Sequence, residues 1–114
     1  MDLDAVKEEI KTICRRDTKM AQYSDPLGHP VLLITGCLSE DPDYQVVAYP
    51  PEVEENDIGR TGVNIWIFEI IGNEIFLYAS KHNRPQSGRI LIHQGQSVLE
   101  DLVWIVKNLQ PCSS

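Results

Sequence analysis

The most strand-like stretch of the chain reads Val63-Asn64-Ile65-Trp66-Ile67-Phe68-Glu69-Ile70-Ile71, then Gly72-Asn73, then Glu74-Ile75-Phe76-Leu77-Tyr78-Ala79-Ser80. Branched and aromatic residues favour extended backbone, and a two-residue turn of glycine and asparagine favours a tight hairpin. We therefore predict two antiparallel strands, 63–71 and 74–80, at the centre of a sheet.

Another hairpin is predicted earlier in the chain. Branched apolar residues fill 31–38, β-forming residues fill 44–49, and the turn-forming residues 39–43 separate the two runs. Pro50-Pro51 ends the second run, because proline cannot donate a hydrogen bond to a neighbouring strand. The acidic segment 52–60 is then expected to be a polar loop.

After the central hairpin, the sequence predicts a polar loop over 81–88 and a short fifth strand over 89–93. Ser97 and Glu100 have the spacing of a capping box, in which each side chain reaches a free amide at the start of a helix. The mostly apolar run 98–109 that follows is expected to be a deeply buried helix.

An amphipathic helix is predicted over 2–16, with Asp2 or Asp4 as its cap and a loop over 19–30 after it. Its apolar residues recur at spacings of three and four, as one stripe of a helix requires. They are Leu3, Val6, Ile10 and Ile13.

These elements predict a single α+β domain over 1–114, with a frayed tail at 111–114. The expected architecture is a mainly antiparallel sheet of about five strands, formed by two hairpins and a short strand, with an N-terminal and a C-terminal helix. No repeat and no low-complexity segment divides the 114 residues.

Composition excludes several classes of protein. No apolar run approaches the ~20 residues of a membrane-spanning helix, and the acidic start of the chain does not resemble a signal peptide, so we expect a cytoplasmic protein with no membrane contact. The three cysteines, Cys14, Cys37 and Cys112, are far apart and form neither a disulfide framework nor a CxxC motif. A net charge of −7 argues against direct binding to nucleic acid.

The central strand is apolar on both faces, which bears on association. Val63, Ile65, Ile67 and Ile71 share one face, whereas Trp66, Phe68 and Ile70 share the other. If both helices cover one face, the other leaves an apolar patch with aromatic side chains, and a homodimer is the simplest cover. Alternatively, the helices pack on opposite faces, or a loop such as 52–60 folds over the second face.

From this pattern we predict partner contacts at Trp66, Phe68 and Tyr78. Glu69 lies between Ile67 and Ile71 on an otherwise apolar face, and we interpret it as a solvent-exposed residue near the end of the strand.

Acidic residues form a second candidate surface. Seven of them fall between Glu40 and Asp57 with no lysine or arginine among them, and such a run can speed encounter with a basic partner. The alternative is a pair of solvated loops that only keep the chain soluble. The predicted docking residues are Glu52, Glu54, Glu55 and Asp57.

No catalytic residues, metal ligands or cofactor site are predicted, because no spacing links the histidines, cysteines and acids of the chain. One polar cluster suits an anion, since it combines cationic side chains with Gly88, which lets backbone approach a phosphate. Its candidate residues are Lys81, His82, Arg84 and Arg89. The alternative is that this cluster is only a polar hairpin connection. Arg60-Thr61-Gly62 could join it only if the fold brings the two loops together.

The leading hypothesis is a small acidic, non-enzymatic binding protein that associates with another macromolecule as a regulator, inhibitor or chaperone-like protein. The alternative is a small enzyme or ligand-binding domain that recognises an anionic small molecule through the 81–89 loop.

Overall fold

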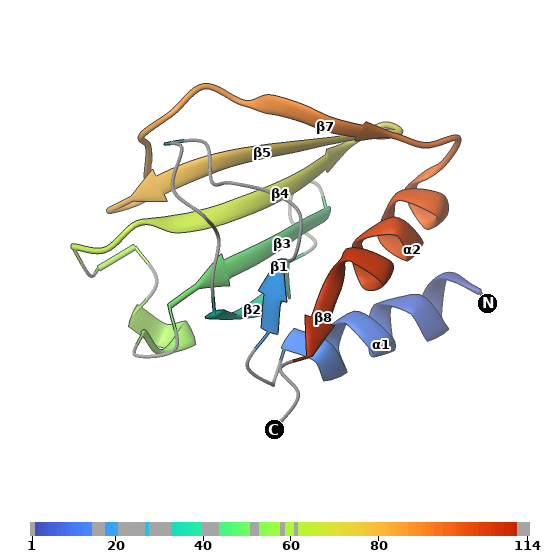
Figure 1. Ribbon diagram of the computed structural model, residues 1–114, viewed down its shortest axis with the longest axis horizontal. Coiled ribbons are helices and arrows are strands. Elements are labelled where there is room, and N and C mark those ends of the chain that lie inside the picture. Colours follow the sequence, from blue (N-terminus) through green and yellow to red (C-terminus); the bar gives the residue numbers. More distant parts are fainter. Residues whose placement is uncertain are drawn as a thin grey trace.

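The computed structural model describes residues 2–14, 18–20, 27, 33–39, 44–50, 53–57, 59–60 and 62–111. Its helices are α1 (Leu3–Cys14) and α2 (Val98–Asn108), with a short 3-10 helix η1 (Glu55–Asp57). The strands are β1 (Thr18–Met20), β2 (Leu33–Ser39), β3 (Tyr44–Tyr49), β4 (Ile65–Ile71), β5 (Glu74–Lys81), β6 (Arg84–Pro85), β7 (Ile90–Gln94) and β8 (Leu109–Pro111) (Figure 1).

The strands form one antiparallel sheet in the order β6-β5-β4-β3-β2-β1-β8. β7 also pairs with β5, over Glu74–Leu77, whereas β6 pairs with the end of the same strand, at Ser80 and Lys81. β6 and β7 therefore follow one another along one outer edge of the sheet. The predicted α+β class, the two hairpins, the fifth strand and the two terminal helices are confirmed.

Three short strands lie where the sequence predicts other structure. β1 overlaps the predicted loop 19–30, β6 lies in the predicted loop 81–88, and β8 includes the end of the predicted helix and the start of the predicted tail. Each of these strands forms because it pairs with another strand. Such pairing does not require a hydrophobic pattern in the short segment itself, so the sequence gives no signal for it. Pro111 is accommodated because β8 is an edge strand. The remainder of the predicted loop apart from Leu27, and residues 112–114, lie outside the described residues.

Both helix starts are capped by side chains. The Ala5 N–H donates to Asp2 Oδ1 at 2.8 Å, so Asp2 rather than Asp4 is the cap of α1. At α2, the Glu100 N–H donates to Ser97 Oγ at 3.2 Å, and Glu100 Oε2 accepts from the Gln96 N–H at 3.3 Å. The predicted capping box is thus present, with its glutamate bonded one residue earlier than in the standard pattern.

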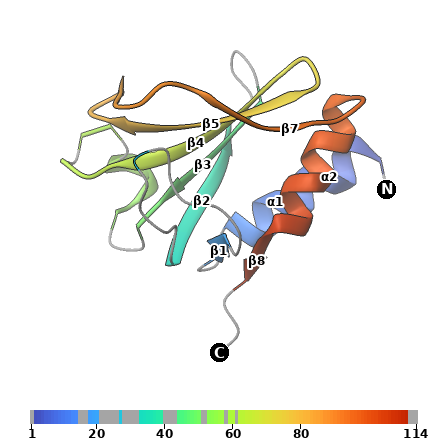
Figure 2. The same cartoon turned by 45° about the horizontal axis from the view of Figure 1, so that its top comes forward.

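The main core lies between the sheet and the two helices, which pack against each other along one face (Figures 1 and 2). Strand register brings apolar side chains into rows on this helix-covered face, for example Val46, Phe68 and Leu77. The fully buried residues are Val6 and Ile10 of α1, Leu102 and Ile105 of α2, and Val46, Ala48, Phe68, Ile70, Ile75 and Leu77 of the sheet.

The opposite face of the sheet, here called the second face, has a smaller apolar cluster. Val47, Tyr49 and Ile65 are buried there with Val53, which comes from the segment after β3. A loop thus contributes to covering this face, as one of the alternatives from the sequence anticipated. The exposed apolar area on this face is therefore smaller than the homodimer prediction assumes, and the homodimer stays a prediction.

Phe68 was predicted as an exposed partner contact, but it is 1% exposed and lies in the main core. We expect Phe68→Ala to lower the free energy of unfolding by about 3–5 kcal/mol, because it removes a fully buried ring. Urea unfolding followed by circular dichroism measures this loss. The matched control is Phe76→Ala, since Phe76 is only partly buried on the second face and its loss should be clearly smaller. Equal losses would contradict the assignment of the two faces.

Candidate functional site

The second face contains a polar cluster centred on the buried side chain of Glu69. Glu69 is 6% exposed, and its Oε1 accepts a hydrogen bond from Arg89 Nε at 2.8 Å, which is also an ion pair. Its Oε2 accepts from Gln45 Nε2 at 2.9 Å. The Arg89 guanidinium lies over the Tyr78 ring, 4.5 Å from the ring centre. The prediction that Glu69 is solvent-exposed is therefore wrong, since two side chains satisfy its carboxylate within the sheet.

Charge within this cluster is balanced. Burial raises the pKa of Tyr78, with a further contribution from the negative charge of Glu69, while Arg89 acts in the opposite direction. The hydrogen bond to Glu69 raises the pKa of Arg89, so its guanidinium stays charged and paired. Arg89 thus pairs with Glu69 at the sheet, while 47% of its side chain stays exposed.

The other three residues of the predicted anion site gather at the β5–β6 turn. Lys81 and Arg84 are register partners, and the turn residues His82 and Asn83 have φ angles of 53° and 60°. Consecutive left-handed residues match the twist of a two-residue hairpin turn. Lys81, His82 and Arg84 therefore project from one tight turn, and His82 and Arg84 are exposed.

The loop before β4 packs against this turn. Gly59 has a φ of 85°, and a Cβ at this position would overlap the Asn83 side chain. A Cβ on Gly62 would lie 3.9 Å from His82 Nε2. The fold thus brings together the two loops that the sequence left separate, and it adds the exposed Arg60 to the neighbourhood of the turn.

The structure describes only part of the predicted acidic surface. Glu54 and Asp57 are exposed at η1, where the Asp57 N–H donates to the Glu54 carbonyl and the Arg60 N–H donates to the Asp57 carbonyl, both at 2.9 Å. The backbone of Glu55 belongs to η1, but its side chain and all of Glu52 lie outside the description. Glu54 and Asp57 are thus exposed on one short helical turn whose backbone bonds to that of Arg60.

The predicted aromatic contacts do not form one surface. Trp66 is partly buried and packs against the main core, on the helix-covered face with Phe68. Tyr78 is buried on the second face, beneath Arg89. The strand register separates these residues because successive side chains alternate between faces.

Edge strand β7 has the most exposed large apolar side chains among those that the structure describes, and the sequence did not single it out. Ile90 and Leu91 are 48% and 50% exposed. β5 is the only pairing partner of β7 among the described strands, so the outer backbone edge of β7 is unpaired there. The apolar triplet Ile90-Leu91-Ile92 was the available signal, but its exposure depends on the position of the strand at the edge.

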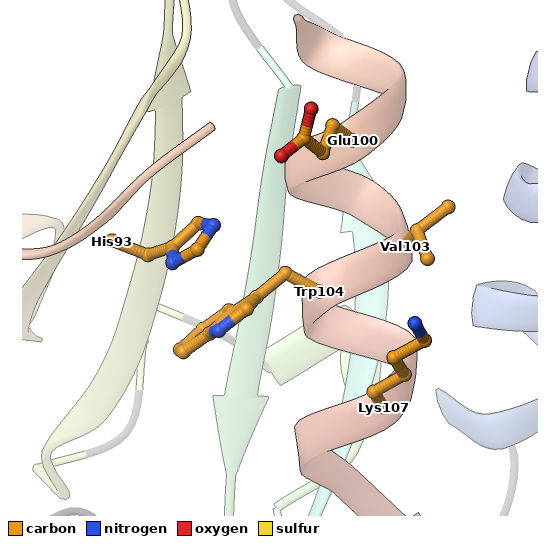
Figure 3. Close-up of a pocket in the computed structure, with 5 residues that line it drawn as sticks. All are labelled: His93, Glu100, Val103, Trp104 and Lys107. Carbon is orange, nitrogen blue, oxygen red and sulfur yellow. The ribbon is translucent and has the colours of Figure 1, made fainter. Parts of the chain in front are cut away.

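A groove of ≈ 160 Å³ lies between β7 and α2. The His93 and Trp104 rings stack across it, with centres 4.7 Å apart and planes inclined by 15° (Figure 3). Glu100, Val103 and Lys107 complete its lining. The stacked rings join the end of β7 to the helix, which makes this groove a structural junction.

Asp101 is buried beneath the same junction. It is 0% exposed, and neither of its carboxylate oxygens has a hydrogen-bond partner among the described residues. A Cβ on Gly95 would lie 2.5 Å from Asp101 Oδ1, so glycine is needed there. Burial raises the pKa of Asp101, and the negative charge of Glu100 raises it further. The backbone of Gly95 and the electrostatic effect of His93 act in the opposite direction.

Within the described ranges, no three histidine, cysteine, aspartate or glutamate side chains lie close enough to hold a metal ion. In the same part of the chain, no helix combines the length and the apolar character needed to cross a membrane. Comparison with protein-family models, with curated proteins and with solved structures finds no match to this chain.

The buried carboxylate of Asp101 makes stability depend on pH. Because folding raises the pKa of Asp101, the folded state favours the protonated carboxyl. The free-energy penalty of burying the charged carboxylate is therefore absent below the ordinary pKa of 3.8 and grows as pH rises through the folded pKa. We expect Asp101→Asn to raise the free energy of unfolding by about 1 kcal/mol at neutral pH, with a smaller gain in acid. Urea unfolding at several pH values measures the difference, and an equal gain at every pH would contradict it.

Proposed function

We propose that this protein is a non-enzymatic binding protein that takes a polypeptide partner on the outer edge of β7. The observation that supports this most directly is the combination of an unpaired strand edge, among the described strands, with the half-exposed side chains of Ile90 and Leu91. Natural sheets usually protect such edges with charges, prolines or covering loops, because an open apolar edge pairs with other chains.

Backbone pairing at a sheet edge is a common way to bind an extended peptide. The edge gains main-chain hydrogen bonds, while apolar side chains next to it add contact area. β7 is held firmly enough for this role, because its start is fixed by the Arg89–Glu69 pair and its end by the His93–Trp104 stack. Binding would not require the edge to be ordered first.

The alternative, an anionic small molecule held by the 81–89 loop, has weaker support. Arg89 is paired with Glu69, and the remaining residues of that loop site project from an exposed turn. A homodimer agrees with the proposal only if the polypeptide that pairs with β7 is a second copy of this chain. The cytoplasm remains the expected compartment on the sequence alone.

Site-specific cross-linking tests the proposal. A photoreactive phenylalanine derivative is placed at Leu91 and, as a matched control, at Ile71, which is 43% exposed and apolar but lies on β4, away from the β7 edge. After irradiation in cells, we expect discrete protein adducts from position 91 and few from position 71. Absence of adducts at 91, or the same adducts at both positions, would overturn the proposal. Adducts of the purified protein with itself at 91 would identify the partner as a second copy.

A further inference from the structure

The outer edge of β5 carries two different surfaces in a fixed order. Ile90 pairs with Leu77, and Arg84 pairs with Lys81 four residues further along the same strand. At ~3.3 Å per residue, the apolar pair of β7 and the basic β5–β6 turn are about 13 Å apart along the edge. One extended peptide can therefore contact both.

The segment that forms this edge differs in charge from the rest of the chain. Residues 81–94 contain Lys81, Arg84, Arg89 and two histidines but no aspartate or glutamate, in a chain of net charge −7. Arg89 is neutralised by Glu69, whereas Lys81, His82 and Arg84 make no ion pair with any residue that the structure describes. The uncompensated positive charge of the edge is thus concentrated at the turn.

The basic turn is held in place before any partner arrives. The Asn83 side chain packs against Gly59, and His82 lies next to Gly62, so the turn is supported by a second loop. Behind the turn, the Gln86 N–H donates to the Ala79 carbonyl at 2.8 Å, and Ser87 Oγ accepts from the Ala79 N–H at 3.0 Å. The backbone of the turn therefore keeps a defined position relative to β7.

We infer that the partner segment is an extended peptide with apolar residues followed by an acidic C-terminal end. All neighbouring strands of the sheet are antiparallel, so an added strand runs opposite to β7. Since β7 runs away from the basic turn, an antiparallel peptide runs toward it and places its C-terminal residues over Lys81, His82 and Arg84. The inference rests on the proposed function and adds the chemistry and direction of the partner.

Fluorescence anisotropy with defined peptides tests the inference. The first probe, of about ten residues, has alternating valine and threonine followed by glutamates; the second has the glutamates at the N-terminus, and the third has C-terminal lysines. We expect the first to bind at least about tenfold more tightly than the other two at low salt, with the advantage reduced at high salt. Equal binding of the three, or no binding of the first, would overturn the inference.

Protein variants separate the two surfaces. We expect Leu91→Lys to weaken binding of the first peptide by about tenfold or more. We expect the double variant Lys81→Glu with Arg84→Glu to bind the first peptide no more tightly than the peptide with C-terminal lysines. The matched controls are Ile71→Lys for the apolar change and Lys11→Glu, on α1, for the charge change, and both should leave binding within about twofold. Circular dichroism establishes that each variant is folded.

The outcomes distinguish the two proposals. If position 91 cross-links a partner but the peptides do not differ, the edge binds polypeptides and the inferred acidic end is wrong. If the charge variant weakens binding and Leu91→Lys does not, the turn is an anion site separate from β7, and both the inference and the proposed function fail.

Discussion

The carboxylate of Glu69 constrains how the sheet can be buried. β4 is apolar on both faces, but only one of them has a charged side chain at its centre. Placing that face beneath two apolar helices would leave the carboxylate without water and without a counter-charge, which costs several kcal/mol. The helices therefore cover the Phe68 face, and Glu69 remains on the second face, where Arg89 and Gln45 satisfy it. The position of the main core follows from this choice.

The same carboxylate shapes the edge of the sheet. Arg89 comes immediately before β7, so its pairing with Glu69 fixes the chain where the strand begins. At the other end, the Gly95 N–H donates to the Asn73 carbonyl at 2.8 Å, and Asn73 Nδ2 donates to the Gly95 carbonyl at 3.0 Å. β7 is thus held at both ends, while Ile90 and Leu91 stay exposed between them. This arrangement combines a firm strand with an accessible edge, which suits binding of an extended chain.

The junction of β7 with α2 places an unfavourable group where β7 ends. Asp101 is buried next to Gly95 without a hydrogen-bond partner among the described residues. It directly follows Glu100, the second residue of the capping box that begins at Ser97. The stacked rings of His93 and Trp104 cover the same junction. Buried carboxylates of this kind lower stability at neutral pH, and the surrounding apolar contacts of Leu102 and Ile105 offset that cost.

Local patterns in the chain were enough to predict both helices, the two hairpins, the fifth strand and the α+β class, because periodicity, caps and turn residues act over a few neighbours. The basic residues at 81–84 were also recognisable from composition. The face that the helices cover, the pairing of Glu69 with Arg89 and the contact between Gly59 and Asn83 depend on register and on residues far apart in the chain. Ile90 and Leu91 read as ordinary strand residues, and their exposure arises only because pairing with β5 places β7 at the edge of the sheet.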